Sequence, residues 1–312
     1  MYIDPQMKAL LEMANSAPGA RPFHDMTPVE ARQAAEVMFA AFRAGAKAVA
    51  KVTDMKIPGP AGEIPIRVYT PAGTGPFGCL VFFHGGGWVI GSIETHDTLC
   101  RELTVGAGVV TVSVDYRLAP EHKFPAAPED CYAATKCAYD SAKSINVDPN
   151  RIAVGGDSAG GNLAAVVSQM ARDRGGPKIA YQYLIYPATD CSDETPSQRE
   201  FALDGYILSR ADMEWFYGHY LNAPDKTNPY ACPGVAKNLA GLPPAFVITA
   251  SIDPLRDEGE TYAEALRKAG VQVKAKRYEG VCHGFLSMAS MVDLGKQAIA
   301  DSCAELRAAI GR

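Results

Sequence analysis

The chain has 312 residues, of which 47% are hydrophobic and 21% charged, and its formal net charge is −5. This composition excludes an intrinsically disordered protein, and the acidic balance removes the basic surface that nucleic-acid binding needs. No apolar run approaches the roughly 20 residues of a membrane helix, and the N-terminus, with Asp4 and Lys8, lacks the apolar core of a signal peptide. We therefore expect a cytoplasmic globular protein of one large domain or two ordinary ones, with no nucleic-acid partner and no membrane span.

Eight cysteines are scattered along the chain, with no Cys-x-x-Cys pair. Zinc sites and redox sites use close pairs, so the spacing argues against both. We expect buried, reduced thiols. Cys282 is the candidate for oxidation, because it adjoins a histidine that becomes important below.

The first fifty residues are predicted to be helical. Thr27 and Glu30 have the spacing of a capping box, and Pro28 suits the first position of a helix. Four apolar residues form a stripe that we expect to pack against a partner: Val37, Met38, Ala41 and Phe42.

From about residue 54, short β-rich runs are followed by alternating strand-like and helical stretches. The expected strands are Ile64–Tyr69, Cys79–Phe83, Val109–Val114, Ile152–Val154, Ala180–Tyr186, Ala245–Thr249 and Val273–Tyr278. The expected helices are Ala127–Lys143, Ala159–Arg174, Asp257–Lys268 and Val292–Ala309. Short apolar strands without strict alternation, separated by helices, favour an α/β fold with a mostly parallel sheet covered on both faces.

One connection is too long for a simple link between strands. The 58 residues from Pro187 to Pro244 stand where roughly a dozen would suffice. Within them, Ser209 and Asp212 are placed to cap a helix that carries Trp215 and Phe216. We interpret the segment as a lid, joined by the N-terminal helices; an ordinary surface excursion remains the alternative.

The sequence contains a single Gly-x-Ser-x-Gly, at Gly156–Gly160, directly after an expected strand and at the start of an expected helix. That setting is the nucleophile elbow, in which a strained turn lifts a serine above the sheet and points the helix N-terminus at developing negative charge. Ser158 is therefore the candidate nucleophile. A phosphate-binding turn is the alternative, but Asn162 stands near the place of the lysine that a P-loop needs.

A serine hydroxyl needs a base, and this elbow places an acid and then a histidine later in the chain. His219 and His283 follow Ser158; His219 falls in the aromatic helix, whereas His283 follows an expected strand by a short loop. We choose His283 as the base. Asp253, shortly after the preceding strand, is the expected acid that holds its tautomer. Three rivals lie on the next helix and suit its N-terminal dipole: Asp257, Glu258 and Glu260.

A run of three glycines between His84 and Trp88 follows another expected strand. Backbone N–H groups free of side-chain bulk could converge there on a carbonyl oxygen, together with the N–H of Ala159. This arrangement predicts an oxyanion hole. We expect His84 to orient the loop and to act as neither acid nor base.

These motifs occur together and in order, with further matching stretches at 115–121, 124–130 and 253–257. The set resembles the bacterial hormone-sensitive-lipase-like carboxylesterases (family IV) of the α/β-hydrolase fold, over nearly the whole chain. The resemblance implies Ser158, Asp253 and His283 as a catalytic triad. It also implies that Gly86, Gly87 and Ala159 are the oxyanion donors.

The resemblance further implies a helical cap built from residues 1–50 and an insertion at about 187–244, on a catalytic domain of residues 51–312. It implies a small ester substrate of short to medium acyl chain and no metal or organic cofactor. We assign Trp88, Leu208 and Phe216 to the substrate pocket.

Two alternatives share the motifs. An amidase or peptidase would use the same triad, and a non-catalytic small-molecule receptor could share the fold, although a receptor would be expected to have lost part of the triad. The last expected strand, Val273–Tyr278, would lie at a sheet edge and could pair with a second copy in a homodimer. Lys274, Lys276 and Arg277 argue partly against that pairing.

Overall fold

The protein is described by a computed structural model that covers residues 2–17, 21–43, 45–192, 195–201 and 205–311. Its centre is an eight-stranded sheet of order β1-β2-β4-β3-β5-β6-β7-β8. Strands β1 and β2 pair antiparallel, as do β2 and β4, and the remaining neighbours pair parallel. The strands are β1 Lys51–Gly59, β2 Gly62–Thr70, β3 Phe77–Phe83, β4 Val110–Val114, β5 Val147–Asp157, β6 Tyr181–Ile185, β7 Ala245–Ile252 and β8 Val273–Cys282.

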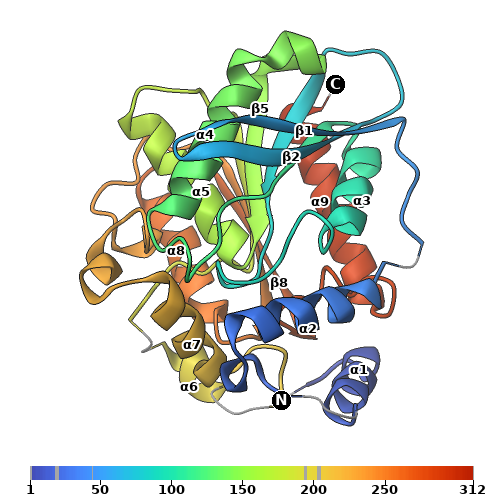
Figure 1. Ribbon diagram of the computed structural model, residues 1–312, viewed down its shortest axis with the longest axis vertical. Helices are drawn as coiled ribbons and strands as arrows, with labels where there is room; N and C mark the ends of the chain where they lie inside the picture. Colours follow the sequence, from blue (N-terminus) through green and yellow to red (C-terminus); the bar gives the residue numbers. More distant parts are fainter. Residues whose placement is uncertain (1, 18–20, 44, 193–194, 202–204, 312) are drawn as a thin grey trace.

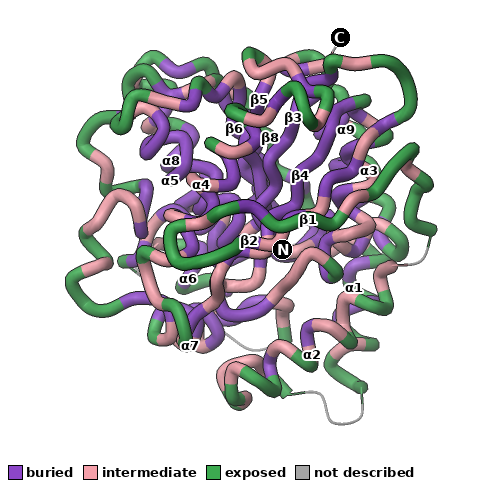
Figure 2. Tube along the Cα trace, turned by 45° about the horizontal axis from the view of Figure 1, so that its top comes forward, coloured by how far each residue is buried: buried purple, intermediate pink, exposed green. Residues whose placement is uncertain are grey.

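Helices cover both faces of the sheet, as Figure 1 shows. Apolar side chains of α3 and α9 join one core cluster, and those of α4, α5 and α8 join the other. The inner strands between these layers are almost continuously buried (Figure 2). The predicted α/β architecture with a mostly parallel, doubly covered sheet is therefore confirmed. The helices are α1 Pro5–Asn15, α2 Pro28–Ala40, α3 Asp97–Ala107, α4 Ala126–Asp140, α5 Ala159–Asp173, α6 Pro196–Glu200, α7 Arg210–Tyr220, α8 Arg256–Lys268 and α9 Asp293–Ile310.

Strand β1, helix α3 and the short helix α6 are not predicted from the sequence. Strand β1 buries Ile57 alone among its nine residues, so it lacks the apolar alternation that marks a strand. Helix α3 buries Leu99, Cys100 and Leu103 against α9, in a stretch of sequence where no helix is predicted. Strand β8 lies at the edge of the sheet, as expected. Its Lys274 and Lys276 pair with Glu305 and Asp301 of α9. Pairing of two copies through β8 stays a prediction.

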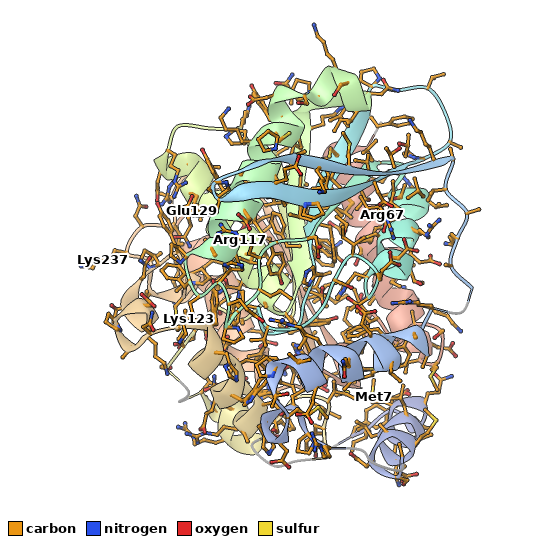
Figure 3. All side chains as sticks on the ribbon, in the orientation of Figure 1. Met7, Arg67, Arg117, Lys123, Glu129 and Lys237 are labelled. Carbon is orange, nitrogen blue, oxygen red and sulfur yellow. A yellow bond between two sulfur atoms is a disulfide. The ribbon has the colours of Figure 1, made fainter. Side chains whose placement is uncertain are left out.

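The N-terminal helices lie at one end of the molecule, near α6 and α7 (Figure 1). The backbone N–H of Asp4 donates to the carbonyl of Gly280 on β8 (2.9 Å), and Met7, labelled in Figure 3, is fully buried. The capping box of Thr27 and Glu30 is present as predicted.

The predicted apolar stripe on α2 is partly wrong. Val37 is 75% exposed and Ala41 is also exposed, while the buried positions of α2 are Ala31 and Ala35. Arg32 holds α2 with Ala31 and Ala35 facing the interior. Its guanidinium donates to the carbonyls of Val89 and Ala119, both at 2.8 Å.

The described residues between 187 and 244 pack in several places, with α6 on α8. Helix α7 begins with the predicted Ser209–Asp212 capping box and lies beside the N-terminal residues. The N–H of His24 donates to Asp212 Oδ1 at 3.1 Å. Lys123 (Figure 3) donates to the carbonyls of Gly218 and Leu221 near the end of α7.

Two loops of that segment, around Cys191 and Cys232, lie beside α5 and correct the expectation of reduced cysteines. The Asn162 side-chain amide donates to the carbonyls of Ala188 (2.9 Å) and Ala231 (2.8 Å), which holds two distant loops together. The Cα atoms of Cys191 and Cys232 are consequently 6.0 Å apart, and the two residues form a disulfide. Sequence spacing could not predict the pair because 41 residues separate its members. The other six cysteines are free thiols.

Candidate active site

Ser158 sits in a sharp turn between β5 and α5. Its backbone angles, φ 57° and ψ −118°, are strained for a residue with a side chain. The turn is possible because of its glycines: a Cβ on Gly156 or on Gly160 would collide with the carbonyl of Phe83. This is the strand–turn–helix setting predicted for Gly156–Gly160, and it presents the serine at the carboxyl end of the strand.

Three side chains from three loops form one hydrogen-bonded series. His283 Nε2 lies 2.9 Å from Ser158 Oγ, and His283 Nδ1 lies 2.8 Å from Asp253 Oδ2. The second oxygen of Asp253 accepts from the N–H of Leu255 at 2.8 Å, which fixes the carboxylate plane. Asp253 is fully buried and His283 is 8% exposed. The structure thus brings together the three residues that the sequence analysis selected.

The glycine-rich loop after β3 lies beside Ser158. Gly86 and Gly87 have φ of +119° and +55°, and a Cβ on Gly87 would overlap the ring of Phe216. Only glycine therefore fits at residue 87, in both conformation and space. Gly86, Gly87 and Ala159 line the same pocket as Ser158. Ala159 begins α5, where backbone N–H groups have no partner within the helix.

Three buried polar residues hold that loop. The N–H of Gly85 donates to Asp157 Oδ1 at 2.9 Å, and His96 Nε2 lies 3.1 Å from the same oxygen. His84 is fully buried, its Nδ1 donates to the carbonyl of Gly85 (2.8 Å), and its ring stacks on Tyr116. Burial, and then the proximity of His96, lowers the pKa of His84 to about 3. His84 is therefore neutral at ordinary pH and suited to orienting the loop.

A pocket of about 100 Å³ opens beside Ser158 and His283. Trp88, Leu208 and Phe216 line it, as the sequence analysis expected. The Trp88 ring stacks on Tyr220 of α7, with ring centroids 4.3 Å apart. The N-terminal segment contributes further walls, all apolar: Phe23, Met38, Phe39 and Phe42. The pocket is thus an apolar recess with a hydrogen-bonded serine at its base.

Comparison with known proteins identifies the family. A profile of the α/β-hydrolase fold matches residues 80–287. The carboxylic ester hydrolase LipN of Mycobacterium tuberculosis is 50% identical over 244 residues, which cover 76% of this chain and 65% of LipN. Esterase LipI of the same organism is 46% identical over 254 residues, covering 80% and 79% of the two chains. The chain belongs to the hormone-sensitive-lipase-like carboxylic ester hydrolases of the α/β-hydrolase fold.

Solved structures agree over almost the full length. A hyperthermophilic esterase of Pyrobaculum calidifontis has a TM-score of 0.93 at 44% identity, and the match covers 99% of both chains. An ester hydrolase from the Lake Arreo metagenome, complexed with a bipyridine phosphonate derivative, has a TM-score of 0.94 at 43% identity over 98% of both chains. Among the residues that this structure describes, no helix is long and apolar enough to cross a membrane.

The rival carboxylates of this ester hydrolase have other partners. Asp257 accepts from the N–H of Ser197 (2.8 Å) and pairs with Arg256. Glu258 is buried and accepts from the N–H of Thr189 at 2.6 Å. Glu260 pairs with Arg277 and accepts from the Thr249 hydroxyl. None of these three contacts His283 in the described residues, in contrast to Asp253.

Several site residues escaped the sequence analysis. His96 and Asp157 hold Gly85, yet neither stands in a pattern that separates it from an ordinary buried residue. Phe39 lines the pocket but is absent from the predicted apolar stripe, because that stripe was centred on Val37, which is exposed. Cys282 does not support the expectation of oxidation: it is fully buried, and burial raises the pKa of its thiol to about 12, which disfavours the reactive thiolate.

Proposed function

We propose that this ester hydrolase cleaves short- to medium-chain acyl esters by two-step acyl transfer through Ser158, His283 and Asp253. One observation carries the proposal: the hydrogen-bonded series from Ser158 Oγ to Asp253 Oδ2 ends at the base of an apolar pocket. Nucleophile, base and orienting acid have the mutual geometry that serine acyl transfer requires.

In the first step, His283 Nε2 takes the Ser158 proton as Oγ attacks the ester carbonyl. The oxyanion that forms accepts hydrogen bonds from the backbone N–H groups of Gly86, Gly87 and Ala159. Asp253 stabilises the imidazolium through Nδ1–H. The alcohol then leaves with the His283 proton, and an acyl group remains on Ser158. In the second step, a water molecule activated by His283 attacks the acyl carbonyl, and collapse of the intermediate releases the acid and restores Ser158.

The small pocket supports the preference for short chains. Its volume of about 100 Å³ is below the roughly 300–1,000 Å³ that is usual for ligand sites, so a long acyl chain needs room from neighbouring side chains. Residues 1–50 and α6–α7 would act as the cap that sets this size. Trp88, Leu208 and Phe216 are proposed to contact the substrate.

The experiment that tests the proposal compares two alanine variants. Ser158→Ala should lose about 10⁶-fold in turnover of p-nitrophenyl butyrate and lose covalent labelling by a fluorophosphonate, with its fold intact by circular dichroism. Ser287→Ala is the matched control, because Ser287 lines the same pocket without belonging to the series. Activity of Ser158→Ala within tenfold of the wild type would refute the assignment.

Matched substrates separate the ester hydrolase from the amidase alternative. An amine is a poorer leaving group than an alcohol and needs stronger protonation by His283. We expect a butyrate ester to react and the matching anilide to be inert under the same conditions. Comparable turnover of both would favour the amidase.

A further inference from the structure

A second, larger cavity lies between α2, α3 and α9. Its volume is about 600 Å³, within the usual range for ligand sites, against about 100 Å³ for the pocket at Ser158. Its wall includes a set of apolar side chains from these helices and the segment after β8: Phe39, Phe42, Leu99, Leu286, Ile299 and Cys303. Ser158 and His283 are not among the residues that line it. Phe39 and Phe42 line both spaces, so their rings stand between them.

The same cavity has a cationic lining. Four cationic side chains line it, against one carboxylate, Glu102: Arg43, Lys47, Lys296 and Arg307. Lys47 pairs with Glu102 at 2.7 Å, and Lys296 pairs with Asp293 at 2.7 Å. Arg43 pairs with Glu36, which lies outside the lining. Arg307 donates to the carbonyl of Gly106 and has no carboxylate partner among the described residues.

One further atom in the lining lacks a partner. Arg43 Nε is buried and makes no hydrogen bond within the described part of the chain. A buried donor without a partner is costly, but Arg43 Nε has almost no accessible surface, so a ligand in the cavity could reach it only after the Arg43 side chain moved. The lining therefore combines an apolar wall with an excess of positive charge, of which Arg307 lacks a carboxylate partner among the described residues.

We propose that this cavity binds an alkyl carboxylate. The alkyl chain would pack on the apolar wall of α3 and α9, and the carboxylate would lie among Arg43, Lys296 and Arg307. A neutral alkyl ligand would leave Arg307 without a carboxylate partner, and a small anion would leave the apolar wall in water. The alkyl carboxylate satisfies both halves. The site is separate from the ester pocket and carries out no chemistry.

Isothermal titration calorimetry with decanoate tests the site on the full chain, in the wild type and in Ser158→Ala. We expect one decanoate per chain with equal affinity in both. Affinity should rise by up to about fourfold for each methylene from hexanoate to decanoate. Decanol and acetate, which each lack half of the proposed ligand, should bind at least tenfold more weakly. Because turnover is not needed, failure of this site and failure of the proposed esterase mechanism are distinguishable.

Two variants locate the site. The double variant Lys296→Gln with Arg307→Gln should weaken decanoate binding about three- to tenfold and reduce its salt dependence. Ala300→Trp, at an exposed position of α9 that lines the cavity, should fill the space and abolish binding. Lys56→Gln with Lys136→Gln is the matched control, because it removes the same charge on β1 and α4.

Wild-type affinity in both cavity variants would overturn the proposal, since decanoate would then bind elsewhere. Equal binding of decanol would overturn the role of charge, and an absence of decanoate binding at millimolar concentration would overturn the site altogether. Turnover of p-nitrophenyl acetate and thermal unfolding confirm that each variant is folded. If Ala300→Trp fails to fold, the charge variant and its control still decide the question.

Discussion

Asp253, the proposed acid, is distinguished from the neighbouring carboxylates by its contacts. Asp253 approaches His283 Nδ1 at 2.8 Å, whereas Asp257, four residues later, holds Arg256 and the N–H of Ser197. Asp253→Asn should lose about 10⁴-fold in turnover, because an amide favours the wrong imidazole tautomer. Asp257→Asn, the same chemical change nearby, should lose little. Steady-state kinetics on p-nitrophenyl butyrate measures both, and equal losses would mean that the wrong carboxylate was chosen.

His84 makes folding sensitive to acid. Its pKa is lowered to about 3 in the folded chain, first by burial and then by His96, whereas an unperturbed histidine titrates near 6.5. Between these values the unfolded chain binds a proton that the folded chain does not. The contribution of His84 to the free energy of unfolding is therefore fully present above about pH 6.5, and it falls as the pH drops toward 3. Between pH 7.5 and pH 5, the free energy of unfolding of His84→Asn should fall by less than that of the wild type.

Urea unfolding at pH 7.5, 6 and 5 measures this difference. The control is His122→Asn, because His122 is exposed and lies outside the loop that His84 orients. The free energy of unfolding of His122→Asn should fall between pH 7.5 and pH 5 by as much as that of the wild type. An equal decline in His84→Asn would show that other groups dominate the acid sensitivity.

The three proposed catalytic residues could be selected from the sequence because each is tied to a local pattern. Ser158 is marked by its glycines, and His283 and Asp253 each follow an expected strand, so the parallel sheet brings them to one edge. The residues that support them, such as Asp157 and His96, meet through tertiary packing and carry no spacing signal. The three side chains that meet could therefore be selected from the sequence, whereas the contacts that support them could not.

At the scale of elements, strands buried on both faces were the easiest to predict. β3, β4 and β6 are buried throughout, so their sequences are rich in apolar and β-branched residues on both faces. β1 escaped prediction because it pairs with β2 alone, at the sheet edge, with most of its residues exposed. The predicted helix Ala127–Lys143 is also shorter in the structure, where α4 ends at Asp140.

The disulfide joins two loops that Asn162 of α5 holds together, and it should contribute to stability. Cys191 and Cys232 are 41 residues apart, and closing a loop of this length in the unfolded chain is worth about 2–4 kcal/mol. The double variant Cys191→Ser with Cys232→Ser should unfold at lower urea concentration by that amount. Ser158 and His283 lie outside the loop that the disulfide closes, so turnover of p-nitrophenyl acetate by the double variant at 25 °C should remain.

A matched control is Cys79→Ser with Cys100→Ser under reducing and non-reducing conditions. These are free, buried thiols, so their loss should destabilise the protein equally with and without reductant. Added reductant should lower the stability of the wild type and leave that of Cys191→Ser with Cys232→Ser unchanged. A reductant effect of the same size in that double variant would contradict a role for the disulfide.

At the scale of the whole molecule, the pocket is closed by parts from both halves of the chain. Asn15 donates to the carbonyl of Gly205 at 3.0 Å, and the Phe23 ring lies 5.8 Å from that of Phe216. These contacts bring the N-terminal segment against α7 and the residues before it. Periodicity indicates helices at both places, but it does not indicate that they meet. Their joint position over Ser158 came from the family resemblance.

The N-terminal segment should therefore control acyl-chain length more than chemistry. Removing residues 1–45 deletes Met38, Phe39 and Phe42 from the pocket wall and leaves Ser158, His283 and the glycine loop in place. The pocket should widen toward the neighbouring cavity, so turnover of p-nitrophenyl octanoate should rise relative to that of the butyrate. Each methylene that gains an apolar contact contributes about 0.8 kcal/mol, which sets the scale of the shift.

Removing residues 1–16 is the matched control for this truncation. It deletes α1, with its buried Met7, and keeps α2 with its pocket side chains. Both truncations should lower stability, since each exposes apolar surface, and the soluble fraction must be assayed. Only the longer one should change the ratio of octanoate to butyrate turnover. An unchanged ratio in folded, active enzyme lacking residues 1–45 would make the N-terminal helices a scaffold, and the size of the pocket would then depend on Phe216 and Leu208 from the other half of the chain.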